Sequence, residues 1–549
     1  MMAFHRKDIL VLSIIIFCWI ALLLLSDVRG NFPLNDDWSY AHSTKVFVED
    51  GRIELTGWAS MPIITQIFWG SLFCSFAGFS FEALRLSTIV FSIIGIIFCY
   101  LIFNESTKQV YLKFVATALI AINPIYFLLS STFMTDIPFF TLSIISTFLF
   151  IRFFKTENKY HFLIGFLFIV AASFIRQIGV LVLLSFALTY SLNKNKLLRK
   201  KIYSILSVLV LILLLFLSQY LIKSGVDNPL VNNHRTDKLL DAFSIVNVFG
   251  LIPLLKNSFF ALIYIGLFLF PFLINHTYLL LKRNSFRKSK FYLSIIASSV
   301  FLLISLIVFN KLLPLRPNIL WKYGLGPATL KDVDILELPH IDQIHQVIWI
   351  MLTLIGIIGS ILIIITIFLY LKENKFKKLI YTDLPSIFIF ITICLTVIIL
   401  SLSNFYDRYL IQLLPLVTFL ILQTNNKEII KRSYFAEKIG YLILIVITLF
   451  TVYETQNYFS WNRCRWEVIK YLTDDLKIQP DNIDGGFEFN GWMGYDPNYI
   501  PNKSKSWWWV KNDTYIVSFG ELKNYTVIQK FEYQSFLKKK YLYALKRKN

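Results

Sequence analysis

The stretch ILVLSIIIFCWIALLLL, from Ile9 to Leu25, contains no charged residue and comes directly after the polar start His5-Arg6-Lys7-Asp8. An apolar run of this length approaches the roughly 20 residues with which a helix crosses a bilayer. No small-residue cleavage site follows the run, so we expect a retained first membrane span, not a signal peptide. Basic residues before a first span favour the cytoplasm, which predicts a cytoplasmic N-terminus.

Composition extends this interpretation to the whole chain. Of its 549 residues, 56% are hydrophobic and only 16% are charged, which is too apolar for a soluble protein. We therefore predict an all-α polytopic membrane protein, multi-pass in the plasma membrane. Much of the net charge of +20 lies in short loops between apolar runs, where it sets topology, so we exclude a nucleic-acid partner. The 5 cysteines are spread singly and predict neither a disulfide framework nor a zinc site.

Four basic loops test the topology, because all four are expected in the cytoplasm and an even number of spans must separate neighbours. They are NKNKLLRKK (193–201), KRNSFRKSK (282–290), KENKFKK (372–378) and NNKEIIKR (425–432). The parity holds for about thirteen spans, near 9–26, 83–103, 110–130, 137–155, 160–175, 177–192, 202–222, 257–281, 291–309, 345–371, 384–403, 407–423 and 438–456. Counting the apolar segment 62–80 as a span would break this parity. We therefore expect it on the outer side, as an interfacial or re-entrant helix.

We expect two domains, a transmembrane domain over 1–459 and a small extracytoplasmic α/β domain over 460–549. In the second, WEVIKYLTDDLK predicts a helix, and TYIVSF, YTVIQKFEY and KKYLYALKR predict strands. The segment DGGFEFNGWMGYDP, 484–497, combines aromatic residues, glycines and acids in a way that suits sugar binding. The Pro- and Gly-rich loop 310–343 is a candidate lid or channel wall.

Two adjacent acids, Asp36 and Asp37, stand in the motif NDDWSYA of the first outer loop, residues 27–61. An aspartate before the amphipathic run 38–48 is a common helix N-cap, which is one alternative. The other is chemical: one carboxylate acts as a general base while its neighbour orients a ligand or helps to hold a divalent metal ion. Asp136, in MTDIPF, also starts an expected helix, and the topology places it on the same side.

Three arginines lie near the outer ends of expected spans, where the positive-inside tendency disfavours them. They are Arg85 in LRLST, Arg176 in FIRQIG and Arg408 in YDRYLIQLLP. Snorkelling to lipid headgroups is the alternative for the first two, and a local pair with Asp407 for the third. A guanidinium binds phosphate through two parallel hydrogen bonds and stays charged near lipid. These arginines therefore predict a phosphate site beside the acids.

A base next to a phosphate site indicates sugar transfer from a polyprenyl-phosphate donor. The lipid chain would lie among the helices, the phosphate on the arginines and the sugar in the outer loops. The carboxylate would take a proton from the acceptor hydroxyl while the lipid phosphate leaves, and direct displacement would invert the anomeric carbon. A metal ion at Asp36 and Asp37 stays open, and the acceptor can be a protein, a glycolipid or another glycan.

The motifs NDDWSYA, LRLST, MTDIPF, FIRQIG and YDRYLIQLLP, in this order, resemble those of GT-C fold membrane glycosyltransferases. They are similar to bacterial family 39-like enzymes, the relatives of protein O-mannosyltransferases and aminoarabinose transferases. The resemblance covers roughly residues 8–425 and implies a polyprenyl-phosphate sugar donor, an outward-facing site, Asp36 as the base and Asp136 as the second acid. The family's His-Pro-Pro element is replaced here by GWASMPIITQ, which keeps only Pro62.

Two rival functions use similar residues. A transporter or flippase for lipid-linked saccharides also needs charged groups at the membrane surface, but the sequence shows neither related halves nor acids midway along spans. A polysaccharide polymerase or ligase is expected to use arginines and histidines of its outer loops in place of acids in the first loop. The acids of NDDWSYA favour the transferase.

Overall fold

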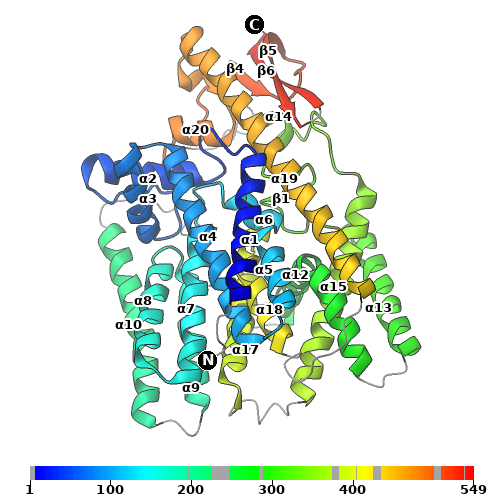
Figure 1. The fold of residues 1–549 in the computed structure, drawn as a ribbon. Coiled ribbons are helices and arrows are strands. Elements are labelled where there is room, and N and C mark those ends of the chain that lie inside the picture. The colour runs from blue at the N-terminus through cyan, green and yellow to red at the C-terminus, as the bar shows by residue number, and fades with distance from the viewer. Residues whose placement is uncertain are drawn as a thin grey trace.

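The computed structural model describes residues 6–193, 197–223, 248–283, 288–373, 382–403, 405–423, 434–499, 508–536 and 538–548. A helical bundle carries a small sheet at one of its ends (Figure 1). We call the end with the sheet, α2, α3 and α20 the sheet end. Much of the four basic loops that set the expected topology lies outside the described residues.

The helices up to residue 223 are α1 (Arg6–Leu25), α2 (Asp37–Asp50), α3 (Ile64–Ala77), α4 (Phe81–Ser106), α5 (Val110–Ala121), α6 (Pro124–Leu129), α7 (Asp136–Thr156), α8 (Lys159–Ser173), η1 (Gln177–Gly179), α9 (Val180–Leu192) and α10 (Leu198–Lys223). The later helices are α12 (Val248–Arg283), α13 (Lys288–Val308), α14 (Lys331–Asp334), α15 (Gln346–Glu373), α17 (Leu384–Leu402), η2 (Asp407–Leu410), α18 (Leu413–Gln423), α19 (Tyr434–Lys470), η3 (Tyr471–Asp475), η4 (Pro480–Asn482) and α20 (Phe487–Gly494). The strands are β1 (Leu320–Trp321), β2 (Gly324–Leu325), β3 (Ile483–Asp484), β4 (Tyr515–Ser518), β5 (Tyr525–Ser535) and β6 (Lys538–Arg547).

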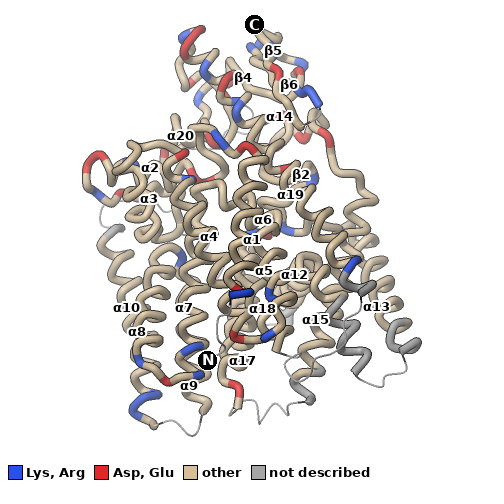
Figure 2. The backbone as a smooth tube through the Cα atoms, in the orientation of Figure 1, with Lys and Arg blue, Asp and Glu red and all other residues tan. Residues whose placement is uncertain are grey.

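Within the described residues, eight helices are long and apolar enough to cross a membrane: α1, α4, α7, α10, α12, α15, α17 and α19. Large apolar side chains point outward from them, such as Phe17 and Leu24 of α1, which are 75% and 76% exposed. Such exposure suits lipid and not water. Figure 2 shows most charged residues near the two ends of the bundle. The chain is therefore an all-α, multi-pass membrane protein, as predicted.

Four of the other five expected spans coincide with shorter or broken helices and the fifth with α13, so the count of about thirteen stays a prediction. The expected span 110–130 is split into α5 and α6 at Asn123-Pro124. The Asn123 side chain accepts hydrogen bonds from the backbone N–H groups of Ile125 and Tyr126, and Pro124 occupies the first turn of α6. An Asn cap followed by Pro starts a helix, and the sequence analysis overlooked this signal.

The segment 62–80 forms α3, whose 14 residues are fewer than the roughly 20 of a span. It packs against α2 and α4, and the backbone N–H of Ile67 bonds to the carbonyl of Ile63 at its start. The predicted helix 38–48 is α2, which lies beside α3 at the sheet end (Figure 1). The first loop and α3 thus form one layer over that end of the bundle.

The C-terminal strands form a four-stranded sheet of order β3-β4-β6-β5, in which β3 runs parallel to β4 and the other pairs are antiparallel. The three strands predicted from the sequence are confirmed as β4, β5 and β6. The predicted helix in WEVIKYLTDDLK is not separate, because its first part continues α19, a helix of 37 residues. The expected domain boundary at 459–460 falls inside this helix, which packs on β5 and β6.

The loop 310–343 packs beneath the sheet. Asp332 accepts hydrogen bonds from His340 Nδ1 (2.8 Å) and from the backbone N–H of Phe519 (3.0 Å). Lys331 reaches Asp513, at the foot of β4, across 2.7 Å. These contacts join the loop 310–343 to the C-terminal segment at the sheet end.

Candidate active site

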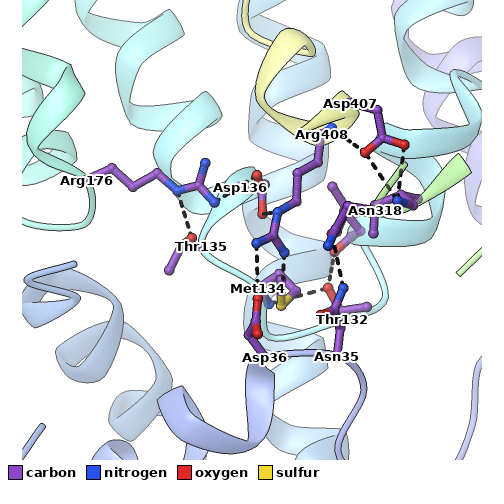
Figure 3. A network of polar contacts seen from close by, with 12 residues as sticks. Asn35, Asp36, Thr132, Met134, Thr135, Asp136, Arg176, Asn318, Asp407 and Arg408 are labelled. Atoms are coloured by element: carbon purple, nitrogen blue, oxygen red, sulfur yellow. Dashed lines mark hydrogen bonds and ion pairs between the residues drawn. The ribbon is translucent and has the colours of Figure 1, made fainter. Parts of the chain in front are cut away.

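Four charged side chains from the starts of four helices meet where α2 rests on the bundle (Figure 3). Asp36 directly precedes α2, and Asp136 is the first residue of α7. Arg176 directly precedes η1, and Arg408 is the second residue of η2. We call these four residues the charged cluster. The structure thus brings together two of the three predicted acids and two of the three predicted arginines.

Acids and arginines alternate in the charged cluster. Arg408 Nη2 lies 3.0 Å from Asp36 Oδ2, and Arg408 Nε lies 3.9 Å from Asp136 Oδ2. Arg176 Nη2 lies 2.8 Å from Asp136 Oδ1. Arg408 therefore stands between the two carboxylates, and the four formal charges sum to zero.

The Asp36 carboxylate does not cap its helix. Asp36 makes no capping hydrogen bond to α2. Its Oδ1 instead accepts a hydrogen bond from Trp58 Nε1 at 2.9 Å, while Oδ2 faces Arg408. On the other side of the cluster, Arg176 Nε donates to Thr135 Oγ1 at 2.8 Å. Both ends of the cluster are thereby held by neighbouring polar side chains.

Asp407 positions the backbone that carries Arg408. Its carboxylate accepts hydrogen bonds from the backbone N–H groups of Arg408 (2.7 Å), Leu320 (2.7 Å) and Ile319 (3.1 Å). The guanidinium of Arg408 is left for Asp36 and Asp136. The alternative of a local pair between Arg408 and Asp407 side chains is therefore wrong.

Burial differs across the charged cluster. The side chains of Arg408 and Asp136 are 2% and 1% exposed, and that of Arg176 is 10%, whereas that of Asp36 is 16% exposed. Within the described residues, both Asp136 oxygens, Arg176 Nη2 and Arg408 Nε have ion-pair partners but no hydrogen bond. Buried charges with unused hydrogen-bonding capacity are rare and concentrate at functional sites.

Asp37 faces away from the cluster. Its carboxylate accepts hydrogen bonds from the backbone N–H groups of Leu34 (2.6 Å) and Phe133 (3.2 Å), and its side chain is fully buried. Burial raises the pKa of the Asp37 carboxyl to about 7. Asp36 and Asp37 therefore point to different partners. Within the described residues, no three His, Cys, Asp or Glu side chains are grouped as metal ligands would be.

Arg85 is also separate from the charged cluster. Its guanidinium donates to the backbone carbonyls of Gly30 and Phe32, and lies 4.8 Å and 5.2 Å from the ring centres of Phe32 and Phe459. It is 3% exposed. These contacts fix the start of the first outer loop against α4 and α19.

Sequence reasoning missed Trp58 and Tyr409. The Tyr409 ring centre lies 4.8 Å from the guanidinium carbon of Arg176 and 5.5 Å from that of Arg408, so the ring is within cation–π distance of both cations. Its position directly after Arg408 in the motif YDRYL was the available signal. Trp58 offered none beyond being a tryptophan in an acidic loop.

Three comparisons with known proteins bear on this site. Residues 62–219, less than a third of the chain, match the family model described as dolichyl-phosphate-mannose-protein mannosyltransferase. No curated protein matches the chain in sequence. The solved structure of ArnT from Cupriavidus metallidurans bound to undecaprenyl phosphate is similar with a TM-score of 0.48 and 10% identity, over 98% of this chain and 97% of that one. The apo state of ArnT gives a TM-score of 0.36 and 12% identity, over 86% and 81%.

Proposed function

We propose that this chain, a relative of the GT-C fold membrane glycosyltransferases, moves a sugar from a polyprenyl-phosphate donor to an acceptor hydroxyl with inversion at the anomeric carbon. The observation that carries the proposal is the charged cluster. Two arginines and two carboxylates are buried together at one end of a membrane bundle, and Asp36 has the most exposed side chain of the four. The matched family model, named for transfer from a lipid phosphate sugar, supports the same donor class.

In the proposed reaction, Arg176 and Arg408 hold the donor phosphate. Both guanidinium groups are buried and face carboxylate oxygens, and phosphate oxygens bind guanidinium groups in the same way. Asp136, 2.8 Å from Arg176 and 3.9 Å from Arg408, keeps the two cations close together before the donor arrives. Arg85 serves the donor indirectly, by fixing the first outer loop.

Asp36 is the proposed general base. It takes the proton of the acceptor hydroxyl, the hydroxyl oxygen forms the new bond to the anomeric carbon, and the bond from that carbon to the phosphate oxygen breaks. The phosphate leaves with the electron pair of the broken bond and is stabilised by the arginines. Asp37 is unsuited to this step, because its side chain is fully buried and faces away from the charged cluster, toward the backbone N–H groups of Leu34 and Phe133.

We place the sheet end outside the cell and the N-terminus in the cytoplasm. Support comes from the basic loops, and from the Lys and Arg segments at the end of the bundle away from the sheet (Figure 2). On this orientation the charged cluster opens toward the extracytoplasmic side, and residues 460–549 form an extracytoplasmic domain beside it. The acceptor then reaches Asp36 from outside the membrane.

The test is a transfer assay with purified protein in lipid nanodiscs and a panel of radiolabelled polyprenyl-phosphate sugars, with cell-surface extracts as acceptors. We expect release of polyprenyl phosphate together with a labelled product whose anomeric configuration is opposite to that of the donor. Movement of the intact donor across a vesicle membrane without transfer would instead establish the flippase.

A further inference from the structure

A buried carboxylate of the C-terminal segment lies directly under the loop that presents Asp36. Glu488, on α20, is fully buried, and its Oε1 accepts a hydrogen bond from the backbone N–H of Asn35 at 2.9 Å. Asn35 immediately precedes Asp36 and has a φ of +56°, in the left-handed region that asparagine adopts more readily than most other non-glycine residues. Its backbone N–H bonds to Glu488 and its side-chain Nδ2 donates to Asn318 Oδ1 at 3.2 Å, so both groups hold the residue before the proposed base.

Two further segments hold Glu488 itself. Its Oε2 accepts hydrogen bonds from Thr329 Oγ1 at 2.6 Å and from Arg465 Nη1 at 2.9 Å. Arg465 belongs to α19 and is also fully buried, while Thr329 belongs to the loop 310–343. One carboxylate thus joins the loop 27–61, the loop 310–343 and α19, and among the described residues its ion-pair partner is Arg465.

The rest of α20 fits the same surface. Gly491 faces the Trp38 ring of α2 so closely that a Cβ there would lie 2.5 Å from it. The backbone N–H of Phe487 donates to the carbonyl of Thr329 at 3.1 Å. The segment that the sequence marked as suited to sugar binding therefore buries Glu488 and its neighbours against the first loop.

We propose that Glu488 is a positioning residue for Asp36, through which the C-terminal segment completes the active site. The proposal rests on the proposed function, in which Asp36 is the base. Without the acceptor oxygen at Glu488, the backbone N–H of Asn35 loses this hydrogen bond and the turn before α2 relaxes. Asp36 then shifts relative to the acceptor hydroxyl, and proton transfer depends steeply on such distances. The phosphate arginines come from other elements and stay in place.

Replacing Glu488 alone would leave Arg465 as an uncompensated buried charge, so misfolding would obscure the result. We therefore compare two double variants in which both charges are absent. Glu488→Gln/Arg465→Met keeps an oxygen that can accept from Asn35, whereas Glu488→Leu/Arg465→Met does not. The two proteins differ only at residue 488, where leucine lacks both the acceptor for Asn35 and the polar atom that faces Thr329.

We expect the Gln variant to keep kcat within about threefold of that of the wild-type protein, because Asn35 keeps its acceptor. The Leu variant should lose about 10- to 100-fold in kcat with the donor KM changed less than about twofold, as is typical when a group that orients a catalytic residue is lost. Equal kcat values in the two variants, or a loss confined to the donor KM, would overturn the proposal.

Hydrogen exchange of the peptide that contains Asn35 gives a second readout that needs no substrate. The backbone N–H of Asn35 should exchange at least about tenfold faster in the Leu variant than in the Gln variant. Equal exchange overturns the anchoring role, whether or not the chain transfers sugar. Absence of transfer by the wild-type protein would instead refute the proposed function and leave the exchange comparison intact. If neither double variant purifies, hydrogen exchange of the wild-type protein serves as the test, and a backbone N–H of Asn35 that exchanges as fast as an unprotected amide refutes the proposal.

Discussion

Replacing Asp36 by asparagine tests the proposed base directly. Asparagine has the same shape, so Trp58 or Arg408 can still donate to its carbonyl oxygen, but it cannot take a proton at neutral pH. Loss of a general base lowers kcat by about 10²- to 10⁴-fold, which corresponds to about 2.7 to 5.5 kcal/mol in the activation barrier. Stability should change far less, by about 1 to 3 kcal/mol, because one hydrogen bond of a partly exposed side chain is lost.

The structure also predicts the sign of the change in donor binding. In the free protein, Asp36 holds Arg408 Nη2 at 3.0 Å, so the carboxylate competes with a donor phosphate for the same guanidinium. Asparagine competes less, because it is neutral. The donor KM of Asp36→Asn should therefore be equal to or lower than that of wild type, while kcat falls.

The assay is release of polyprenyl phosphate from the labelled donor, with kcat and the donor KM determined separately. Asp27→Asn is the matched control, because Asp27 lies in the same loop but pairs with Arg29 and Arg463, at 2.6 Å and 3.0 Å, away from the cluster. A variant Asp36→Asn that keeps more than about a third of the wild-type kcat would refute the reasoning, since no general base contributes so little.

Three further predictions follow from the same contacts. Arg408→Lys keeps the charge but loses the forked geometry, so the donor KM should rise about tenfold or more in the same assay. Asp37→Asn should flatten the dependence of stability on pH. A carboxyl whose folded pKa is about 7 stabilises the fold at low pH and loses this contribution, on the order of 4 kcal/mol, between about pH 4 and 7. Thermal unfolding of wild type and variant from pH 4 to 8 measures the difference. Equal dependence of stability on pH in the wild-type protein and in Asp37→Asn would contradict this. Trp58→Phe removes the N–H that holds Asp36 and should lower kcat about 3- to 10-fold without raising the donor KM. The control is Trp508→Phe, since the Trp508 ring centre lies 4.8 Å from that of Trp58, and this variant should keep the wild-type kcat.

Local chemistry predicted much of this fold. Apolar runs of about 20 residues identified the helices α1, α4 and α7, and alternating apolar and polar residues identified β5 and β6, because both patterns depend on nearby residues only. The breaks were harder to predict. A cap such as Asn123 sets the end of a span. The length of α19 is set by the sheet that packs on it, which is a tertiary effect.

The candidate site shows the same division. Parity of the spans was enough to predict that Asp36, Asp136, Arg176 and Arg408 share one end of the bundle. It could not separate these residues from Arg85, because whether an arginine faces a ligand or its own backbone depends on side-chain direction. The partners contributed from far along the chain, such as Glu488 beneath Asn35, leave no local pattern at all.

The balance of two acids against two arginines has a consequence for the end of the catalytic cycle. A polyprenyl-phosphate sugar is a phosphodiester with one negative charge, whereas the lipid phosphate that remains after transfer is a monoester with nearly two at neutral pH. On the proposed function, the arginines that bind the donor bind this product more strongly, because its charge is larger. Each turnover would then finish with the site occupied by its own by-product, so the rate in a living membrane would depend on how quickly that by-product departs and is recycled.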